Sequence, residues 1–370
     1  METVNNFYFH FLNPQIRVAL AFALAIVLNA YAIPVILYIS RKKNLFDGDA
    51  KAEGKQIIPT IGGLGIFASF IIVSLTFVNT CGLNGNVSSL GSLPPIIAGV
   101  TLIFFIGMKD DLLDVSYWKK LLVELLALGI IIVVGEVRIN SLQGMFTFME
   151  LSYAASVLLS IFVGFIIINA FNFIDGIDGL ASSIALIGSI VFGFFFIASS
   201  EYEYAILAFT LTGSLIPFIY YNINGRKNKL YLGDTGSLLI GLMVTVLVFR
   251  FNQLNSSAFY KHFFVAAPAF SFAVVIVPMF DVARVFILRI FNRTIPFKAD
   301  RRHLHYILVD CGLTHLQSTA LLLGINLAFI VFAYYFNFLG NSTLMYIMLA
   351  AIFTFSVFVT WLKRRNGLRK

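Results

Sequence analysis

The stretch NAFNFIDGIDGL, at residues 169–180, carries polar side chains at a regular spacing of three residues. The amides are Asn169 and Asn172, the carboxylates are Asp175 and Asp178, and Gly176 and Gly179 lie among them. Each step of three residues falls short of a helical turn by about 60°, so the four side chains share a narrow face only if the backbone breaks. The glycines permit such a break, which predicts a helix end, a tight turn and a new helix starting near Asp178. Grouped carboxylates and amides suit metal or phosphate chemistry, whereas the plainer alternative is a set of helix caps.

Two further stretches carry carboxylates. In KDDLLDVSYWKK the adjacent Asp110 and Asp111 repel each other, and the pKa of one rises unless a cation lies between them. Mg²⁺ is such a cation, and proteins commonly hold it with one or two carboxylates together with substrate phosphates. In YLGDTGSL, Asp234 precedes an apolar segment, which predicts a helix N-terminus whose N–H groups favour anions. A solvated loop and a helix-capping Asp are the respective alternatives.

Basic and aromatic side chains follow in the stretch ADRRHLHY. Arg301 and Arg302 offer planar donor groups suited to phosphate oxygens. His303 and His305 point together on an extended loop but apart on a helix. Two His without further ligands make a poor zinc site, so phosphate contact or proton handling is favoured over zinc. The alternative is an ordinary basic loop.

Two lysines are candidates for a phosphate contact. Lys120 ends the acidic stretch, and Lys55 lies in GKQIIPTIGG, just before an apolar segment. Each is equally compatible with a basic loop on the cytoplasmic side of a membrane, so the spacing alone leaves both interpretations open.

The elements that must position these residues are membrane helices. The chain of 370 residues is 59% hydrophobic and 12% charged, whereas globular domains have about 25% charged residues. Apolar stretches of roughly 18 or more residues are long enough to cross a bilayer. We therefore predict an all-α polytopic membrane protein with a single domain over residues 1–370. The eleven predicted spans are residues 16–39, 60–79, 94–108, 120–137, 151–171, 179–199, 203–222, 236–253, 262–290, 316–337 and 342–362.

The basic residues predict the orientation of these spans. Of the 26 Lys and Arg residues, 22 fall on one side of the membrane when the spans are threaded in order. Cytoplasmic segments carry such an excess, so we expect the N-terminus outside and the C-terminus in the cytoplasm. The carboxylates of the polar stretches fall on this cytoplasmic side, at span ends. A proton relay would need carboxylates at membrane depth, so their placement favours chemistry at the membrane surface.

The polar stretches therefore converge on one membrane face. They supply acids for Mg²⁺, basic groups for phosphate and glycine turns for close approach. This combination implies a diphosphate substrate that meets a lipid substrate at the cytoplasmic interface. Nucleic acid is not expected as a partner, because no basic stripe is combined with a binding motif. A membrane transporter or flippase is the alternative from a different class, although we find no repeat and no polar residues at midplane.

At these residues the sequence resembles the polyprenyl-phosphate N-acetylhexosamine-1-phosphate transferases. The matching motifs are PTIGG at 59–63, DDLLD at 110–114, NAFNFIDGIDGL at 169–180, GDTGSL at 233–238 and DRRHLHY at 300–306, in collinear order over residues 34–315. The resemblance implies transfer of a sugar 1-phosphate from a UDP-sugar to undecaprenyl phosphate, which yields a polyprenyl-diphospho-sugar and UMP. It also implies a multi-pass protein of the bacterial inner membrane with its active site on the cytoplasmic face.

The HLHY sequence is similar to the bacterial branch that transfers unmodified N-acetylhexosamine 1-phosphate and starts a cell-envelope glycan such as O-antigen or teichoic acid. We therefore expect UDP-GlcNAc as the donor. The branch that transfers phospho-MurNAc-pentapeptide has three clustered His at this point and remains the alternative. Tyr306 departs from the bacterial branch, which usually has His there. The sugar, the downstream glycan and a homo-oligomeric state are left open.

The resemblance also implies roles for individual residues. The catalytic residues would be Asp110, Asp111, Lys120 and His303. The ligands of Mg²⁺, or of Mn²⁺ in its place, would be Asp234 and Asn172. The substrate-binding residues would be Lys55, Asn169, Asp175, Gly176, Asp178, Arg301, Arg302 and His305. Within this set, Gly176 and Asp178 would lie against uracil, and the segment from Arg301 to His305 would hold the diphosphate. Whether the Asp110–Asp111 pair acts as base or nucleophile is left open.

Overall fold

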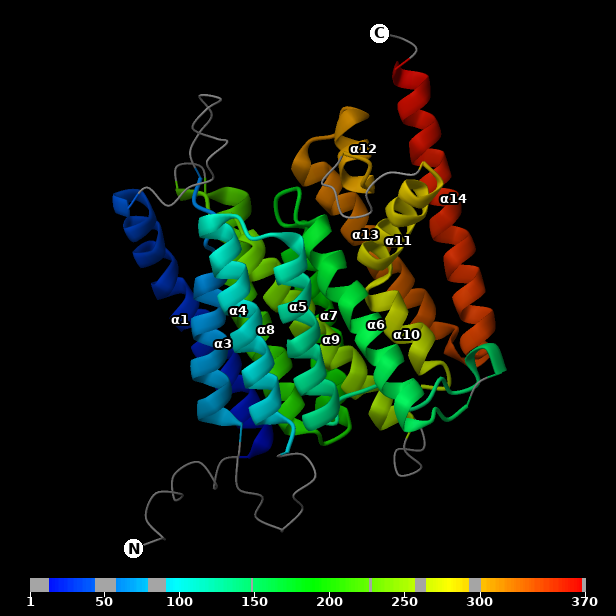
Figure 1. Cartoon of the computed structure of the whole chain (residues 1–370), viewed down its shortest axis with the longest axis horizontal. Helices are drawn as coiled ribbons and strands as arrows, with labels where there is room; N and C mark the ends of the chain where they lie inside the picture. The colour runs from blue at the N-terminus through cyan, green and yellow to red at the C-terminus, as the bar shows by residue number, and fades with distance from the viewer. Residues whose placement is uncertain are drawn as a thin grey trace, which may run out of the picture.

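The computed structural model describes residues 13–43, 58–78, 91–147, 149–225, 228–256, 264–292 and 301–367. Within these ranges the chain is helical and forms no strand; the one β-bridge pairs Ser141 with Glu150. Most of the long helices run side by side in one bundle (Figure 1). The predicted all-α fold is therefore confirmed.

Each of the eleven apolar stretches contains helix. The helices are α1 (Pro14–Lys43), α3 (Gly63–Phe77), α4 (Leu93–Leu113), α5 (Tyr117–Gly129), α6 (Tyr153–Ile174), α7 (Leu180–Ala198), α8 (Tyr202–Asn224), α9 (Gly233–Ser256), α10 (Ala267–Val274), α11 (Ile276–Phe291), α12 (Leu304–Asp310), α13 (His315–Tyr335) and α14 (Asn341–Gly367). A π-helical turn at Ile130–Val134 extends α5, and short 3₁₀ turns lie at Met145–Thr147 and Asn337–Leu339.

The chain is a multi-pass membrane protein. Seven of the described helices are long and apolar enough to cross a bilayer, and α10 with α11 makes an eighth if the bent pair is one span. The total of eleven spans and the orientation of the termini stay predictions.

Helix α9 lies at the centre of the bundle. It contacts α3, α4, α6, α7, α8 and α10, and 89% of its apolar window is buried. These neighbours surround α9 and place it inside the bundle (Figure 1). A small residue lets α6 approach, since a Cβ at Gly241 would lie 2.8 Å from the Ile168 Cα. The central position of α9 means that its N-terminus, which carries Asp234, can be reached from several helices.

The predicted span 262–290 is broken. Its two helices, α10 and α11, meet at an angle of 81°. Pro278 lacks the N–H that would bond to the Val274 carbonyl, so the α-helical ladder cannot continue across this point. The amide of Asn326, on α13, replaces the missing contacts: it donates to the Val274 carbonyl at 3.0 Å and accepts from the Val277 N–H at 3.4 Å. An unpaired backbone group is costly within a membrane, so Asn326 stabilises the break.

We expect Asn326→Ala to lower the free energy of unfolding by about 1–3 kcal/mol, because it leaves buried backbone groups without partners. Thermal and SDS-induced unfolding in detergent micelles measures the change. The matched control is Asn292→Ala, since Asn292 is exposed and, among the described residues, its side chain bonds to its own helix at the Leu288 carbonyl. Equal losses in both variants would contradict the role of Asn326.

Candidate active site

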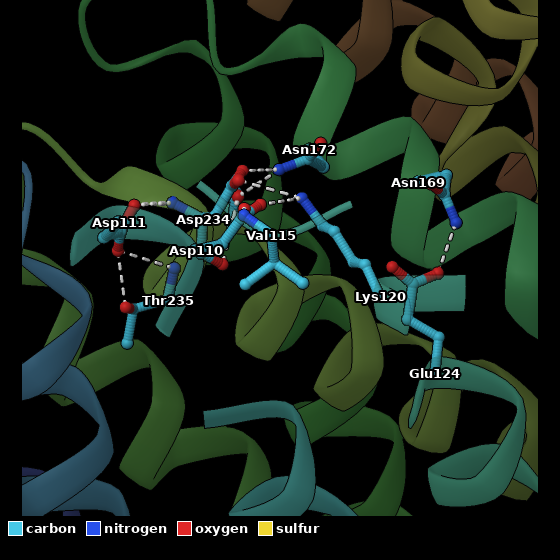
Figure 2. A network of polar contacts seen from close by, with 10 residues as sticks. Asp110, Asp111, Val115, Lys120, Glu124, Asn169, Asn172, Asp234 and Thr235 are labelled. Carbon is cyan, nitrogen blue, oxygen red and sulfur yellow. Dashed lines mark hydrogen bonds and ion pairs between the residues drawn. The ribbon is translucent and has the colours of Figure 1, made fainter. Parts of the chain in front are cut away.

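The C-terminal ends of α4 and α6 meet the N-terminal end of α9, at the upper end of the bundle in Figure 1. Figure 2 shows side chains from α4, α5, α6 and α9 directed toward one another. The structure thereby brings together the two acidic stretches, which are more than a hundred residues apart in sequence, and Asn172. Asn172 belongs to the stretch of Asn and Asp residues at 169–178, called the Asn/Asp repeat below.

Asp111 caps the start of α9 from a different helix. Its Oδ1 accepts a hydrogen bond from the Asp234 N–H at 2.7 Å, and its Oδ2 accepts from the Thr235 N–H at 3.0 Å and the Thr235 hydroxyl at 2.5 Å. The first N–H groups of a helix lack partners within the helix, and the helix dipole favours an anion there. Because both carboxylate oxygens are engaged, Asp111 holds the end of α4 against the start of α9 (Figure 2).

Glycine makes this junction close enough for such bonds. A Cβ at Gly107 would lie 2.6 Å from the Thr235 Cα, and one at Gly233 would lie 1.9 Å from the Thr60 carbonyl oxygen. Gly233 also has φ of +70°, a conformation that other residues rarely adopt. The PTIGG stretch lies against the same turn, since Gly62 donates to the Tyr231 carbonyl at 3.0 Å. In the structure this stretch therefore supports the start of α9.

Lys120 joins the two acidic stretches. Its Nζ lies 3.1 Å from Asp110 Oδ2 and 2.8 Å from Asp234 Oδ2. The other oxygen of Asp110 accepts from the Val115 N–H at 2.6 Å, and the other oxygen of Asp234 accepts from the Asn172 amide. The cation that neighbouring carboxylates require is thus an ammonium group, buried between them (Figure 2).

Burial raises the pKa of Asp110 and Asp111, which follow the apolar stretch 94–108. For Asp111 the pKa reaches about 6, although its hydrogen bonds to Thr235 act in the opposite direction. Burial, together with the negative charges of Asp234, Asp111 and Asp178, also raises the pKa of Asp175 well above its usual value. Besides burial, the negative charge of Asp234 raises the pKa of Asp110, Asp111 and Asp175, so a bound cation would stabilise the site.

The donor set suits Mg²⁺ only in combination with a substrate. Within the ranges that the structure describes, no three His, Cys, Asp or Glu side chains form a group that could hold a metal ion by themselves. Asp110 and Asp234 nevertheless face one centre, with the Asn172 amide beside Asp234. Mg²⁺ is usually held by one or two carboxylates plus substrate phosphates, and this donor set satisfies that requirement.

Asn169 is directed toward a residue that the sequence analysis did not single out. Its amide donates to Glu124 Oε2 at 2.7 Å and to the Phe165 carbonyl at 3.0 Å. Glu124 is buried one turn after Lys120 on α5 (Figure 2). The i, i+4 spacing of Lys120 and Glu124 was a signal that could have found it. Asn169 thus supports α5 from α6, and its predicted substrate contact stays a prediction.

The segment of residues 301–306 contacts the Asn/Asp repeat at Gly176. A Cβ there would lie 2.5 Å from His305 Nε2 and 2.5 Å from the Tyr306 hydroxyl, so only glycine leaves room for this segment. His305 is 1% exposed, and neither ring nitrogen has a hydrogen-bond partner among the described residues. Burial lowers the pKa of His305 to about 4, so the ring is neutral at neutral pH. A buried ring without partners would be stabilised by a ligand that offers hydrogen bonds.

Asp178 does not cap the helix that follows it. The N-cap of α7 is Gly179, with φ of +75°, and its N–H donates to the Asn222 side chain at 2.6 Å. The Asp178 carboxylate instead pairs with Lys229 at 2.7 Å and lies 3.6 Å from His315 Nδ1. The helix break near Asp178 is confirmed, but the capping alternative for this carboxylate is wrong. Lys229 is a second residue that the sequence motifs did not reveal.

Asp281 of α11 anchors His303. Its Oδ2 lies 2.9 Å from His303 Nδ1, while its Oδ1 accepts from the Leu304 N–H at 2.9 Å and from Arg284 at 3.0 Å. His303 is extended and precedes α12, whereas His305 lies within it, and their rings are nearly parallel with centroids 5.7 Å apart. Asp281 therefore fixes the orientation of His303 and the start of α12.

The arginines of this segment lie toward α14. Arg301 is 67% exposed, pairs with Asp310 at 3.0 Å and covers the Tyr306 ring at 5.2 Å. Arg302 lines a cavity beside α14, and its carbonyl accepts a hydrogen bond from Arg284. Their role in holding a diphosphate stays a prediction. Lys55 lies outside the described residues.

We expect Asp281→Asn to lower the free energy of unfolding by about 3 kcal/mol, because a buried carboxylate with three partners loses its charge. Thermal unfolding in detergent measures this loss. The matched control is Asp310→Asn, where the pairs with Arg301 and Lys363 are accessible to solvent and the expected loss is about 1 kcal/mol or less. A loss for Asp281→Asn no larger than that of the control would show that Asp281 does not anchor the segment.

Comparison with known proteins completes the description of the site. Residues 93–252, which hold the acidic stretches and the Asn/Asp repeat, match the family model described as glycosyl transferase family 4. An undecaprenyl-phosphate alpha-N-acetylglucosaminyl 1-phosphate transferase of Escherichia coli K12 is 27% identical over 86% of this chain and 84% of its own length. The Salmonella typhi protein of the same name is 26% identical over 87% and 86%. A probable undecaprenyl-phosphate N-acetylglucosaminyl 1-phosphate transferase of Bacillus subtilis 168 is 26% identical over 96% and 93%.

Proposed function

We propose that this chain is a member of glycosyl transferase family 4 and transfers N-acetylglucosamine 1-phosphate from UDP-GlcNAc to undecaprenyl phosphate. The products are undecaprenyl-diphospho-N-acetylglucosamine and UMP, and the reaction would start a cell-envelope glycan. The observation that carries the proposal is the Lys120 ammonium held between Asp110 and Asp234 at one end of a membrane bundle. The names of relatives that match most of this chain support the same reaction.

The contacts of Asp110 and Asp111 differ, which supports a different role for each residue. Asp111 has both oxygens engaged at the start of α9, so it positions the site. Asp110 also has both oxygens engaged, by the Val115 N–H and by Lys120, but its Lys120 contact lies beside Asp234. It is therefore the member of the pair that would meet an incoming phosphate, through the Lys120 ammonium group. Asp110 would then orient the lipid phosphate, one oxygen of which attacks the β-phosphorus of the donor as the bond from that phosphorus to UMP breaks.

Charge neutralisation is the main requirement of this step, because an anionic phosphate attacks an anionic diphosphate. Lys120 would stabilise the negative charge that develops on the transferred phosphoryl group. Asp234 and Asn172 would hold Mg²⁺, which when bound supplies further positive charge to the diphosphate. His305, which is neutral and lacks hydrogen-bond partners among the described residues, would hydrogen-bond the donor beside Gly176.

The orientation predicted from the basic residues would place this site at the cytoplasmic face of the inner membrane. That location matches the chemistry, since UDP-sugars are water-soluble and the lipid phosphate lies at the membrane surface. The two substrates would meet where α4 and α6 end and α9 begins.

We expect release of UMP and formation of a lipid-linked sugar from UDP-GlcNAc and undecaprenyl phosphate. A panel of radiolabelled UDP-sugars, with extraction of the lipid product, tests the donor. Tyr306→His serves as a matched variant and should leave the donor choice unchanged. Turnover of UDP-MurNAc-pentapeptide instead of UDP-GlcNAc would place the enzyme in peptidoglycan synthesis. Turnover of another UDP-N-acetylhexosamine alone would change only the sugar, and no UMP release from any donor would favour a transporter or flippase.

We expect turnover to require Mg²⁺ or Mn²⁺ and to fall by about 100-fold or more in Asp234→Asn, because the charge that would hold the cation is lost. Rates are measured with and without EDTA, and Mn²⁺ binding is followed by electron paramagnetic resonance. Glu203→Gln, which removes a carboxylate at the opposite end of the bundle, is the control for loss of charge. Full activity in EDTA would refute the metal assignment while leaving the transfer reaction intact.

A further inference from the structure

A cationic cavity of about 370 Å³ lies between α11, the segment before α12, and α14. It lies beyond the carboxylate cluster, on the side of the bundle where α11, α12 and α14 come together in Figure 1. The cationic side chains that line it are Arg284, Arg301, Arg302, Lys363 and Arg364, and its remaining lining includes Leu288 and Ile307. Guanidinium and ammonium groups above an apolar floor are suited to an anion that is attached to an apolar body.

The cavity carries an excess of positive charge even when Arg302 is left aside. Asp281 pairs with Arg284, and Asp310 pairs with both Arg301 and Lys363. Two carboxylates thus face four cations, and within the described ranges Arg364 has no acidic partner. The Asp281 carboxylate also contacts His303, so its negative charge is divided between Arg284 and the histidine ring. Cations held this close repel one another, so a bound anion would stabilise the arrangement.

The residues around the cavity are of the kinds expected at a membrane surface. On α14, Phe358 and Trp361 are exposed and stacked, with the Arg365 guanidinium 5.4 Å from the Trp361 ring centroid. Exposed aromatic rings followed by basic residues are typical of the boundary between bilayer and water. On α11 the exposed side chains of Ile290 and Phe291 are apolar, as expected for a surface that faces acyl chains.

We propose that this cavity binds the head group of an anionic phospholipid. The phosphodiester would contact Lys363, Arg364 and the arginines of the 301–302 segment, and the acyl chains would follow the exposed apolar residues of α11 and α14. Basic pockets between membrane helices on the cytoplasmic side bind anionic head groups in this way. A free phosphate shares the charge but gains nothing from the apolar floor.

Binding would also connect the lipid to the segment that carries His303. Asp310 holds Arg301 at the start of this segment and Lys363 on α14. A head group that engages both cations would fix the segment against α14. The proposal concerns a site separate from the carboxylate cluster and does not depend on the transfer reaction.

The test is binding of dioleoyl-phosphatidylglycerol to the purified full-length protein in a neutral detergent, titrated by native mass spectrometry. The variant is Lys363→Ala with Arg364→Ala. The matched control is Lys42→Ala with Lys43→Ala, which removes two exposed cations from the end of α1. Dioleoyl-phosphatidylcholine and inorganic phosphate are the comparison ligands, and thermal unfolding without lipid shows that each variant is folded.

The expected result is tight binding of phosphatidylglycerol that weakens by about 30-fold in the α14 variant and by less than about threefold in the α1 control, since each cation near an anionic surface contributes about fivefold. Equal weakening in both variants would mean general attraction to the surface and would overturn the site. Undiminished binding in the α14 variant would overturn it too. Inorganic phosphate binding as tightly as the lipid, with the same sensitivity to the variants, would show an ion site and refute the lipid assignment. No substrate is needed, so the outcome is independent of the proposed activity.

Discussion

The bond between the Asp111 carboxylate and the first N–H groups of α9 is the constraint on which the site depends. It joins the end of one helix to the start of another, and the partial charges at that start make the carboxylate favourable there. With α4 held in this way, Asp110 faces Asp234, and Lys120 can lie between them. The two carboxylates and the ammonium group lie on three different helices. Without the Asp111 contact, the distances between these groups would not be fixed. Gly107 and Gly233 matter for the same reason, because a side chain at either would separate the helices.

A second anchor brings the histidine segment to the same end of the bundle. Asp281 fixes His303 and the start of α12, and Gly176 accepts His305 and Tyr306 at close range. Asp281 is itself on α11, which the break at Val275 turns away from α10 by 81°. The direction of α11, and hence the position of the histidines, therefore depends on the backbone contacts that Asn326 supplies across that break.

The carboxylate cluster and the cationic cavity differ in electrostatic character. Around Asp110 and Asp175, burial and the neighbouring negative charges raise the pKa of each carboxyl group and favour a bound cation. Along α14 the cations exceed the described carboxylates and favour a bound anion. His305, which lies against Gly176, is neutral because burial lowers its pKa to about 4. The proposed substrate, with its phosphates and a divalent cation, would suit the carboxylate cluster, whereas the proposed anionic lipid would suit the cationic cavity.

The sequence by itself determined the helical membrane fold, the polar stretches and the resemblance to a known family, because apolar length and short motifs are local properties that no packing can change. It also located the helix break near Asp178, since glycine spacing is local. Only the tertiary structure decided which partner each polar residue has. Asp178 pairs with Lys229 rather than capping α7, Asn169 bonds to Glu124, and Asp111 caps a helix more than a hundred residues away. Such contacts join segments distant in sequence, and their geometry depends on how closely the helices pack, which spacing along the chain does not specify.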